Sequence, residues 1–116
     1  MPQQGSSAVA EPTVRREIQQ DREHKRQPRY HVILWDDDDH SYEYVILMMR
    51  QLFGHAFERG FQIAKQVDGG GRAICITTTR EHAELKRDQI HSFGRDHLIN
   101  RCAGSMSATI EPESGE

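Results

Sequence analysis

Four consecutive aspartates occupy positions 36–39, directly after the apolar segment 30–35. Carboxylates at the end of a buried strand can hold a divalent cation for phosphoryl transfer, or they can accept charge-assisted hydrogen bonds from an ammonium group. A negatively charged helix start needs only one or two acids, so this role explains Asp39 better than it explains the whole run. The run is therefore the first candidate for a functional site.

A metal-dependent protein is one interpretation of these aspartates. Asp36 and Asp38 could hold Mg²⁺ in a small phosphotransfer or receiver-like protein, but such proteins also need a lysine and a second acidic cluster on an open α/β sheet, for which 116 residues leave no room. A calcium loop starting at Asp36 would need glycine sixth and glutamate twelfth, where this chain has Ser41 and Leu47. We expect no metal and no cofactor, and keep phosphotransfer as the alternative function.

Other catalytic motifs are missing from the sequence. The seven histidines include no HExxH pair, no serine or cysteine lies in a GxSxG context, and the glycines at 69–71 lack the Lys-Ser/Thr of a phosphate loop. Cys75 lies in the apolar run 73–76 and is expected to fill the core, and both cysteines are expected to be reduced thiols. We therefore expect a binding protein and not an enzyme.

Composition limits the fold and its partners. With 116 residues and 35% hydrophobic content, the chain should form one small core with disordered ends. A formal charge of -3 gives no general attraction to nucleic acid, no apolar run approaches the roughly 20 residues that cross a bilayer, and the first ten residues lack the apolar centre of a signal peptide. We expect a cytoplasmic monomer that binds neither nucleic acid nor membranes.

The ends of the chain differ from its middle. Residues 1–28 combine Pro, Gln, Ser and dense charge with almost no bulky apolar side chain, so they cannot bury enough surface to offset the entropy of ordering. We predict a flexible N-terminal tail over 1–28, a folded core over 29–113 and a disordered C-terminus over 114–116.

Hydrophobic patterning places the aspartates at a junction between a strand and a helix. Residues 30–35 form a short aromatic and β-branched run, which predicts a strand. Residues 41–53 repeat apolar side chains at spacings of three and four, which predicts a helix that begins at Asp39 or Ser41 as N-cap and ends at Gly54.

Four further elements follow along the chain. A second helix should run from Phe57 to Asp68 and end in a mobile turn of three glycines, and residues 72–77 should form a second strand. Thr78 and Glu81 fit a capping box that opens a third helix ending near Gly94, and residues 106–110 should form the last strand. The order β-α-α-β-α-β predicts a two-layer α+β fold, with a small three-stranded sheet covered by three helices.

This arrangement makes cation capture a third interpretation of the aspartates. Val45 on the first helix and Val67 on the second could line an apolar pocket, although core packing is the more common role for a valine. Asp68 ends the second helix close to where Asp36 ends the first strand. Carboxylates at the mouth of an apolar pocket could bind an ammonium group that carries an apolar side chain.

The chain resembles the ClpS family of Clp-protease adaptors over about residues 30–113. The matching stretches are residues 30–38 (Tyr-x-Val-Ile-Leu-x-x-Asp-Asp) with Glu43 and Val45; Glu58, Arg59 and Gln62 before Val67; residues 71–75 (Gly-Arg-Ala-Ile-Cys); and Ala83, Glu84 and Lys86, with Thr109, Ile110 and Glu111 at the end. Their order and spacing agree with the family.

The resemblance implies a non-enzymatic adaptor with a ClpS-like fold. Such an adaptor binds the free α-amino group and the bulky hydrophobic first side chain of an N-degron protein. It delivers that protein to the N-terminal domain of a ClpA- or ClpC-type AAA+ unfoldase for degradation by ClpP. The tail before Tyr30 resembles the family's extension, which is needed for delivery and not for peptide binding.

The resemblance also assigns roles to individual residues. By position, the amine-binding residues are Asp36, Asp37, Asp38 and Asp68, the side-chain pocket is formed by His40, Tyr42, Val45, Ala64, Val67 and Met106, and the unfoldase contacts are Glu81 and Lys86. Asp68 replaces the usual histidine, Ala64 replaces a customary methionine, and Tyr42 stands at the pocket entrance. These departures add a carboxylate and alter the pocket, so they bear on which first residue fits. Clustered carboxylates raise one another's pKa unless a cation lies among them, which predicts a pH-sensitive site.

Overall fold

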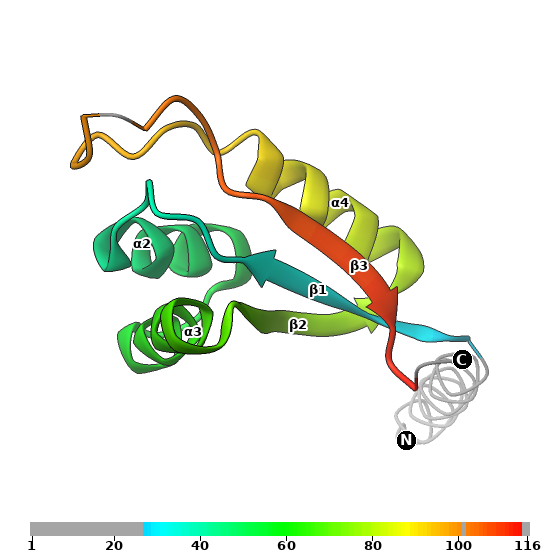
Figure 1. Ribbon diagram of the computed structural model, residues 1–116. Coiled ribbons are helices and arrows are strands. Elements are labelled where there is room, and N and C mark those ends of the chain that lie inside the picture. The colour runs from blue at the N-terminus through cyan, green and yellow to red at the C-terminus, as the bar shows by residue number, and fades with distance from the viewer. Residues whose placement is uncertain (1–26, 101, 115–116) are drawn as a thin grey trace, which may run out of the picture.

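The computed structural model describes residues 27–100 and 102–114. Its elements are, in chain order, β1 (Arg29–Trp35), α2 (Tyr42–Phe53), α3 (Phe57–Gly70), β2 (Arg72–Thr79), α4 (Arg80–His91) and β3 (Ala108–Pro112), as labelled in Figure 1. The predicted α+β fold with the order β-α-α-β-α-β is confirmed. Nearly all of the predicted tail, residues 1–26, and residues 115–116 of the predicted C-terminus lie outside the described residues.

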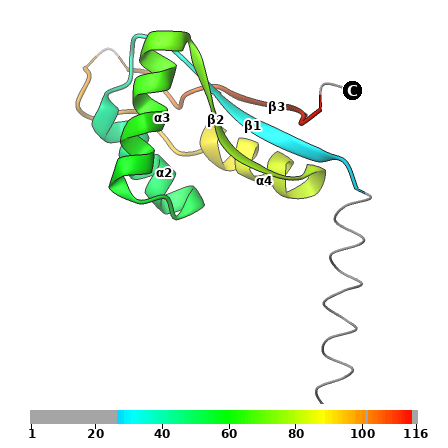
Figure 2. The ribbon, with the colours of Figure 1, turned by 90° about the horizontal axis from the view of Figure 1, so that it is seen from below.

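The three strands form one antiparallel sheet in the order β2-β1-β3, with β1 in the centre. The α4 helix runs along the sheet, while α2 and α3 lie next to each other at the end of the sheet where β1 ends (Figure 1, Figure 2). The register between β1 and β2 shifts between Val32 and Ile33, which leaves Cys75 as the extra residue of a bulge.

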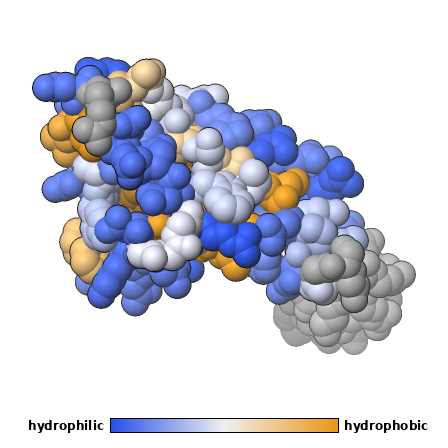
Figure 3. Space-filling view, viewed as in Figure 1, coloured by the Kyte–Doolittle hydropathy of each residue, from blue (hydrophilic) through white to orange (hydrophobic). Residues whose placement is uncertain are grey.

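One hydrophobic core joins the helices to the sheet. Its buried residues are Val32, Leu34, Tyr44, Val45, Met48, Met49, Ile63, Ala64, Val67, Ala73, Cys75, Ala83, Ile90, Met106 and Ala108. Cys75 was expected to fill the core, and its thiol is buried, which raises its pKa to about 12. The surface seen from the direction of Figure 1 is mostly hydrophilic, with hydrophobic residues in scattered patches (Figure 3).

The ends of α2 follow the sequence signals. Ser41, and not Asp39, is the N-cap, since its hydroxyl accepts a hydrogen bond from the Tyr44 N–H at 3.2 Å. Gly54 ends the helix in the left-handed conformation with φ 71°, which glycine adopts without a Cβ penalty. The α2 helix thereby holds a fixed position just after the four aspartates.

Other boundaries differ from the predictions. Gly69 and Gly70 still belong to α3, and the left-handed cap is Gly71. The capping box at Thr78 is wrong, because Thr78 pairs with Tyr30 in the sheet and Thr79 caps α4 instead.

The last strand is also displaced from its predicted position. It starts at Ala108 and runs to Pro112, while Met106 is buried in the segment before it. Proline is tolerated there because β3 is an edge strand, where a missing backbone N–H leaves no ladder bond unmade.

Candidate functional site

A small cavity with a volume of about 40 Å³ lies where β1, α2 and α3 meet the segment that leads into β3. We call it the acidic pocket, and it is lined by Asp36, Asp37, His40, Ser41, Tyr42, Val45, Ala64, Val67, Asp68 and Met106. The structure thus brings together all the predicted amine-binding and side-chain-pocket residues except Asp38. Asp38 is exposed and does not line the cavity.

Backbone hydrogen bonds bring these distant segments together. The Asp36 N–H donates to the Gly71 carbonyl at 2.9 Å, which places the end of β1 beside the end of α3. The Trp35 N–H donates to the Ser107 carbonyl at 3.0 Å, which holds the segment of Met106 against the same end of β1. Asp36 and Asp68 therefore share one pocket although 32 positions separate them in the sequence, by subtraction of their numbers.

The acidic side of the pocket has a strongly negative field. Desolvation raises the pKa of Asp36, and the negative charges of Asp38, Asp68 and Asp37 raise it further. Among the described residues, neither Asp36 nor Asp68 has a cationic side chain within ion-pair distance. A cation placed between these carboxylates would relieve their mutual repulsion.

Asp37 is held in place by its neighbours. One of its carboxylate oxygens, Oδ1, accepts hydrogen bonds from the Asp39 N–H at 3.0 Å and from His40 Nδ1 at 2.7 Å. The His40 side chain is only 4% exposed, and its Nε2 lies 2.8 Å from the Gly104 carbonyl. Both ring nitrogens of His40 are thus within hydrogen-bond distance of an oxygen atom, and Nε2 also lies 3.3 Å from Cys102 Sγ. His40 therefore lies behind the carboxylates and orients one of them.

The segment between α4 and β3 docks onto this corner through Asp96. Asp96 is only 2% exposed, and its carboxylate accepts hydrogen bonds from the Ser41 N–H at 2.5 Å and the Leu98 N–H at 2.9 Å. Burial alone would raise the pKa of Asp96, but these backbone hydrogen bonds outweigh it and lower that pKa. Sequence reasoning did not identify Asp96, because it lies in a polar loop without any motif.

Tyr42 lines the pocket and bridges two of its helices. Its hydroxyl donates a hydrogen bond to Asp68 Oδ2 at 2.9 Å, and this bond raises the pKa of Tyr42 above its usual value. The ring meets Phe61 of α3 edge to face, with 5.7 Å between centroids. The first residue of α2 is thereby linked to α3 across the cavity. Nothing in the sequence pattern indicated the bond to Asp68.

The two predicted unfoldase contacts are differently placed on α4. Glu81 is exposed in the first turn. Lys86 donates from Nζ to the Leu52 carbonyl at 2.6 Å and lies 5.7 Å from the centre of the Phe53 ring, so it also ties α4 to the end of α2. The two side chains are five positions apart on the helix and point in different directions.

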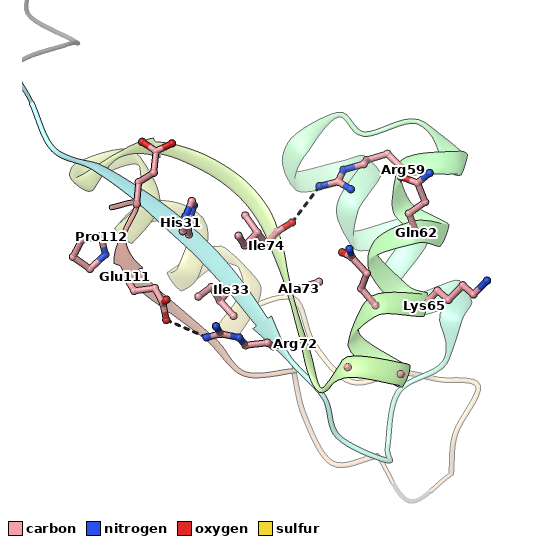
Figure 4. A pocket seen from close by; sticks show the side chains of 14 residues that line it. His31, Ile33, Arg59, Gln62, Lys65, Arg72, Ala73, Ile74, Glu111 and Pro112 are labelled. Atoms are coloured by element: carbon pink, nitrogen blue, oxygen red, sulfur yellow. Dashed lines mark hydrogen bonds and ion pairs between the residues drawn. The ribbon is translucent and has the colours of Figure 1, made fainter. Parts of the chain in front are cut away.

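A second and larger hollow lies elsewhere on the molecule. This outer groove has a volume of about 1110 Å³ and runs between α3 and the sheet (Figure 4). Arg59 donates to the Ile74 carbonyl at 3.3 Å, and Arg72 forms an ion pair with Glu111 at 3.3 Å. One ion pair and one side-chain-to-backbone hydrogen bond therefore link charged residues of this groove to the sheet. Sequence reasoning did not predict this groove.

Two structural findings bear on the alternative functions. Within residues 27–100 and 102–114, no group of three or more His, Cys, Asp or Glu side chains is arranged to hold a metal ion. Asp36 and Asp38, considered above for phosphotransfer, do not belong to such a group there. None of the helices that the structure describes has the length and apolar character needed to cross a bilayer.

Comparison with known proteins assigns the chain to a family. Residues 25–99 match the model of the family described as ATP-dependent Clp protease adaptor protein ClpS. The ClpS adapter protein of Xylella fastidiosa strain M12 is 37% identical over 70 residues, which are 60% of this chain and 66%, just under two thirds, of that protein. The ClpS adapter protein of Desulforapulum autotrophicum is 31% identical over 86 residues, which are 74% of this chain and 78% of that protein.

A solved structure agrees with the fold. The structure of Agrobacterium tumefaciens ClpS2 bound to L-phenylalaninamide superimposes with a TM-score of 0.66, at 24% identity, over 76% of this chain and 100% of that one. At this level of identity the likeness concerns the fold. Taken together with the family model and the sequence relatives, the three-stranded sheet and its three helices lead to one conclusion: the chain belongs to the ClpS family of ATP-dependent Clp protease adaptor proteins.

Proposed function

We propose that this protein binds the free α-amino group and bulky hydrophobic first side chain of N-degron proteins and delivers them to a ClpA- or ClpC-type unfoldase for degradation by ClpP. The observation that carries the proposal is the acidic pocket itself. Carboxylates of Asp36, Asp37 and Asp68 line the same cavity as the apolar side chains of Val45 and Val67. An adaptor of this kind performs no catalysis and needs no cofactor.

The chemistry of an α-ammonium group fits the acidic side of the pocket. The group carries a positive charge and three N–H donors, which match the carboxylates of Asp36 and Asp68, since neither has a cationic partner among the described residues. Asp37 is already oriented by His40. Asp38 does not line the cavity, and we propose that it acts through its charge, which raises the pKa of Asp36.

The apolar side of the pocket accounts for the hydrophobic first residue. Val45, Ala64, Val67 and Met106 are all buried and converge on the cavity from α2, α3 and the segment before β3. Burying one large apolar side chain contributes about 1.5–3 kcal/mol, while micromolar affinity needs about 8 kcal/mol. The amine and the side chain must therefore both contribute. The binding of L-phenylalaninamide by A. tumefaciens ClpS2 supports the same division, since that ligand has a free amine and an aromatic side chain.

Delivery requires surfaces outside the pocket. We propose that the exposed Glu81 contacts the N-terminal domain of the unfoldase, and that Lys86 contributes there while it also binds the Leu52 carbonyl. Residues 1–28 would serve as the extension needed for handover. The protein would act as a monomer in the cytoplasm, without contact to nucleic acid or membrane.

Calorimetry with short peptides tests the proposed function. Peptides that start with Leu, Phe, Tyr or Trp should bind the intact protein, and their N-acetylated forms should bind at least about tenfold more weakly, because acetylation removes the charge and two of the three donors. Peptides of the same sequence that start with Gly control for binding to the rest of the peptide. Equal affinity of free and acetylated forms would contradict the proposal.

A further inference from the structure

The contact between Tyr42 and Asp68 has a consequence for ligand selection. Among the carboxylates of the acidic pocket, Asp68 is the one that accepts a hydrogen bond from a tyrosine, at 2.9 Å. The donor is a neutral phenol on the first residue of α2, and the acceptor is exposed near the end of α3. The phenol therefore uses an acceptor site that faces the same cavity as Asp36.

We propose that the Tyr42 hydroxyl competes with the ligand's ammonium group for Asp68. This inference rests on the proposed function and names how that same pocket is controlled. In the ligand-free protein the phenol takes one carboxylate acceptor, and a bound ammonium group takes its place. The Tyr42 ring then moves away from the mouth of the cavity and leaves room for the first side chain.

The size of the cavity requires this movement. A volume of about 40 Å³ holds only a few water molecules, at about 10–15 Å³ each. No bulky side chain fits unless a wall moves. The other apolar walls, Val45, Ala64, Val67 and Met106, are buried in the core, where close packing resists displacement. Tyr42 is only partly buried and lies against the edge of Phe61, so it can turn outward more easily than the buried apolar walls.

The exchange at Asp68 favours a charged ligand. A hydrogen bond from a cationic donor to a carboxylate is about twice as strong as one from a neutral donor. Replacing the phenol by an ammonium group therefore gains binding free energy, whereas replacing it by a neutral donor gains none. Opening the pocket costs the same free energy for every ligand. Only a ligand with both a charged amine and a large apolar side chain therefore binds measurably.

The hydroxyl and the ring of Tyr42 contribute separately. Tyr42→Phe removes the bond to Asp68 but keeps the ring and its contact with Phe61. Tyr42→Ala removes both and enlarges the entrance. The first substitution should therefore change affinity alike for all bulky first residues, and the second should also change their order.

Calorimetry with peptides starting with Leu, Phe or Trp, each free and N-acetylated, tests the inference on the intact protein and both variants. Tyr42→Phe should bind every free peptide about three- to tenfold more tightly than the unaltered protein, as expected for one lost competing hydrogen bond. Their order should stay the same. Tyr42→Ala should shift the order toward Trp. Equal or weaker binding by Tyr42→Phe would overturn the inference.

A spectroscopic measurement covers the case in which a variant fails to fold. In the unaltered protein at pH 6.5, the Cζ resonance of Tyr42 should shift when a free peptide binds, because the phenol loses Asp68, and should not shift with the acetylated peptide. If free and acetylated peptides bind every protein equally, the proposed function itself fails. If free peptides are preferred throughout but neither the affinity of Tyr42→Phe nor the Cζ resonance changes, only the role of Tyr42 is refuted.

Discussion

Two carboxylates next to the start of α2 are used in opposite ways. Asp96 is buried and accepts two backbone N–H groups, which lower its pKa. Asp36 is exposed among other carboxylates, which together with desolvation raise its pKa. The first charge is satisfied within the protein and stabilises it. The second has no cationic partner among the described residues, and under the proposed function it serves a ligand at a cost in the stability of the free protein.

Removing Asp96 should have the largest effect. Asp96→Ala leaves the partly buried Ser41 N–H without its acceptor at the start of α2 and should lower the free energy of unfolding by about 2–3 kcal/mol. Chemical denaturation followed by circular dichroism measures this loss. Asp88→Ala, an exposed carboxylate on α4, is the matched control and should change stability by less than about 0.5 kcal/mol. A similar loss in both variants would show that the hydrogen bonds of Asp96 do not account for it.

Asp36→Asn should act in the opposite direction. It removes a charge that is repelled by Asp38, Asp68 and Asp37, so the unfolding temperature of the ligand-free protein should rise. The affinity for a Phe-initiated peptide should fall at least about tenfold, because a charge-assisted contact becomes a neutral one. Thermal unfolding and calorimetry on one sample measure both effects. A variant that loses stability without losing affinity would reverse the roles assigned to the two aspartates.

The dependence on pH should separate the same two groups, with a smaller effect. Asp36 has a raised pKa, so binding of an ammonium ligand should weaken as the pH falls toward a value above the ordinary 3.8. Asp96 has a lowered pKa, so its contribution to stability is fully present above 3.8 and is lost only as the pH falls further through its folded value. Binding should therefore weaken while the protein is still folded. Peptide titrations between pH 4 and 7, with circular dichroism at each pH, check this order.

Much of the fold follows from local sequence patterns. Apolar spacing in α2 and α3 indicates which residues face the core, and the continuous apolar run of β1 predicts a strand in which Val32, Ile33 and Leu34 are all buried. Those faces carry Val45 and Val67, so local periodicity together with the family resemblance predicted most residues that line the pocket, although Asp38 does not line it and Ser41 was missed. The boundaries of helices and strands were harder to predict, because a threonine such as Thr78 can either cap a helix or extend a strand. The pairing of Thr78 with Tyr30 decides between these roles.

Side-chain contacts between distant segments could not be predicted in this way. The hydrogen bond from Tyr42 to Asp68 depends on how α2 crosses α3, and that from Ser41 to Asp96 depends on the path of a loop. Neither hydrogen bond joins residues at a fixed sequence spacing, so no sequence pattern predicts it. The same holds for Lys86, for which the family resemblance implied a partner contact but whose Nζ also binds the Leu52 carbonyl.

Mapping a bound peptide by NMR tests most directly where the ligand lies. When a Phe-initiated peptide with a free amine is titrated into the ¹⁵N-labelled protein, the largest shifts are expected at the amides of Asp36, Asp37, Val67 and Asp68. The amides of Gln62 and Ile74, which line the larger outer groove, should change little. The N-acetylated peptide should leave all of these amides unchanged at the same concentration. Shifts concentrated in the outer groove, or equal shifts with both peptides, would contradict the assignment of the acidic pocket as the ligand site.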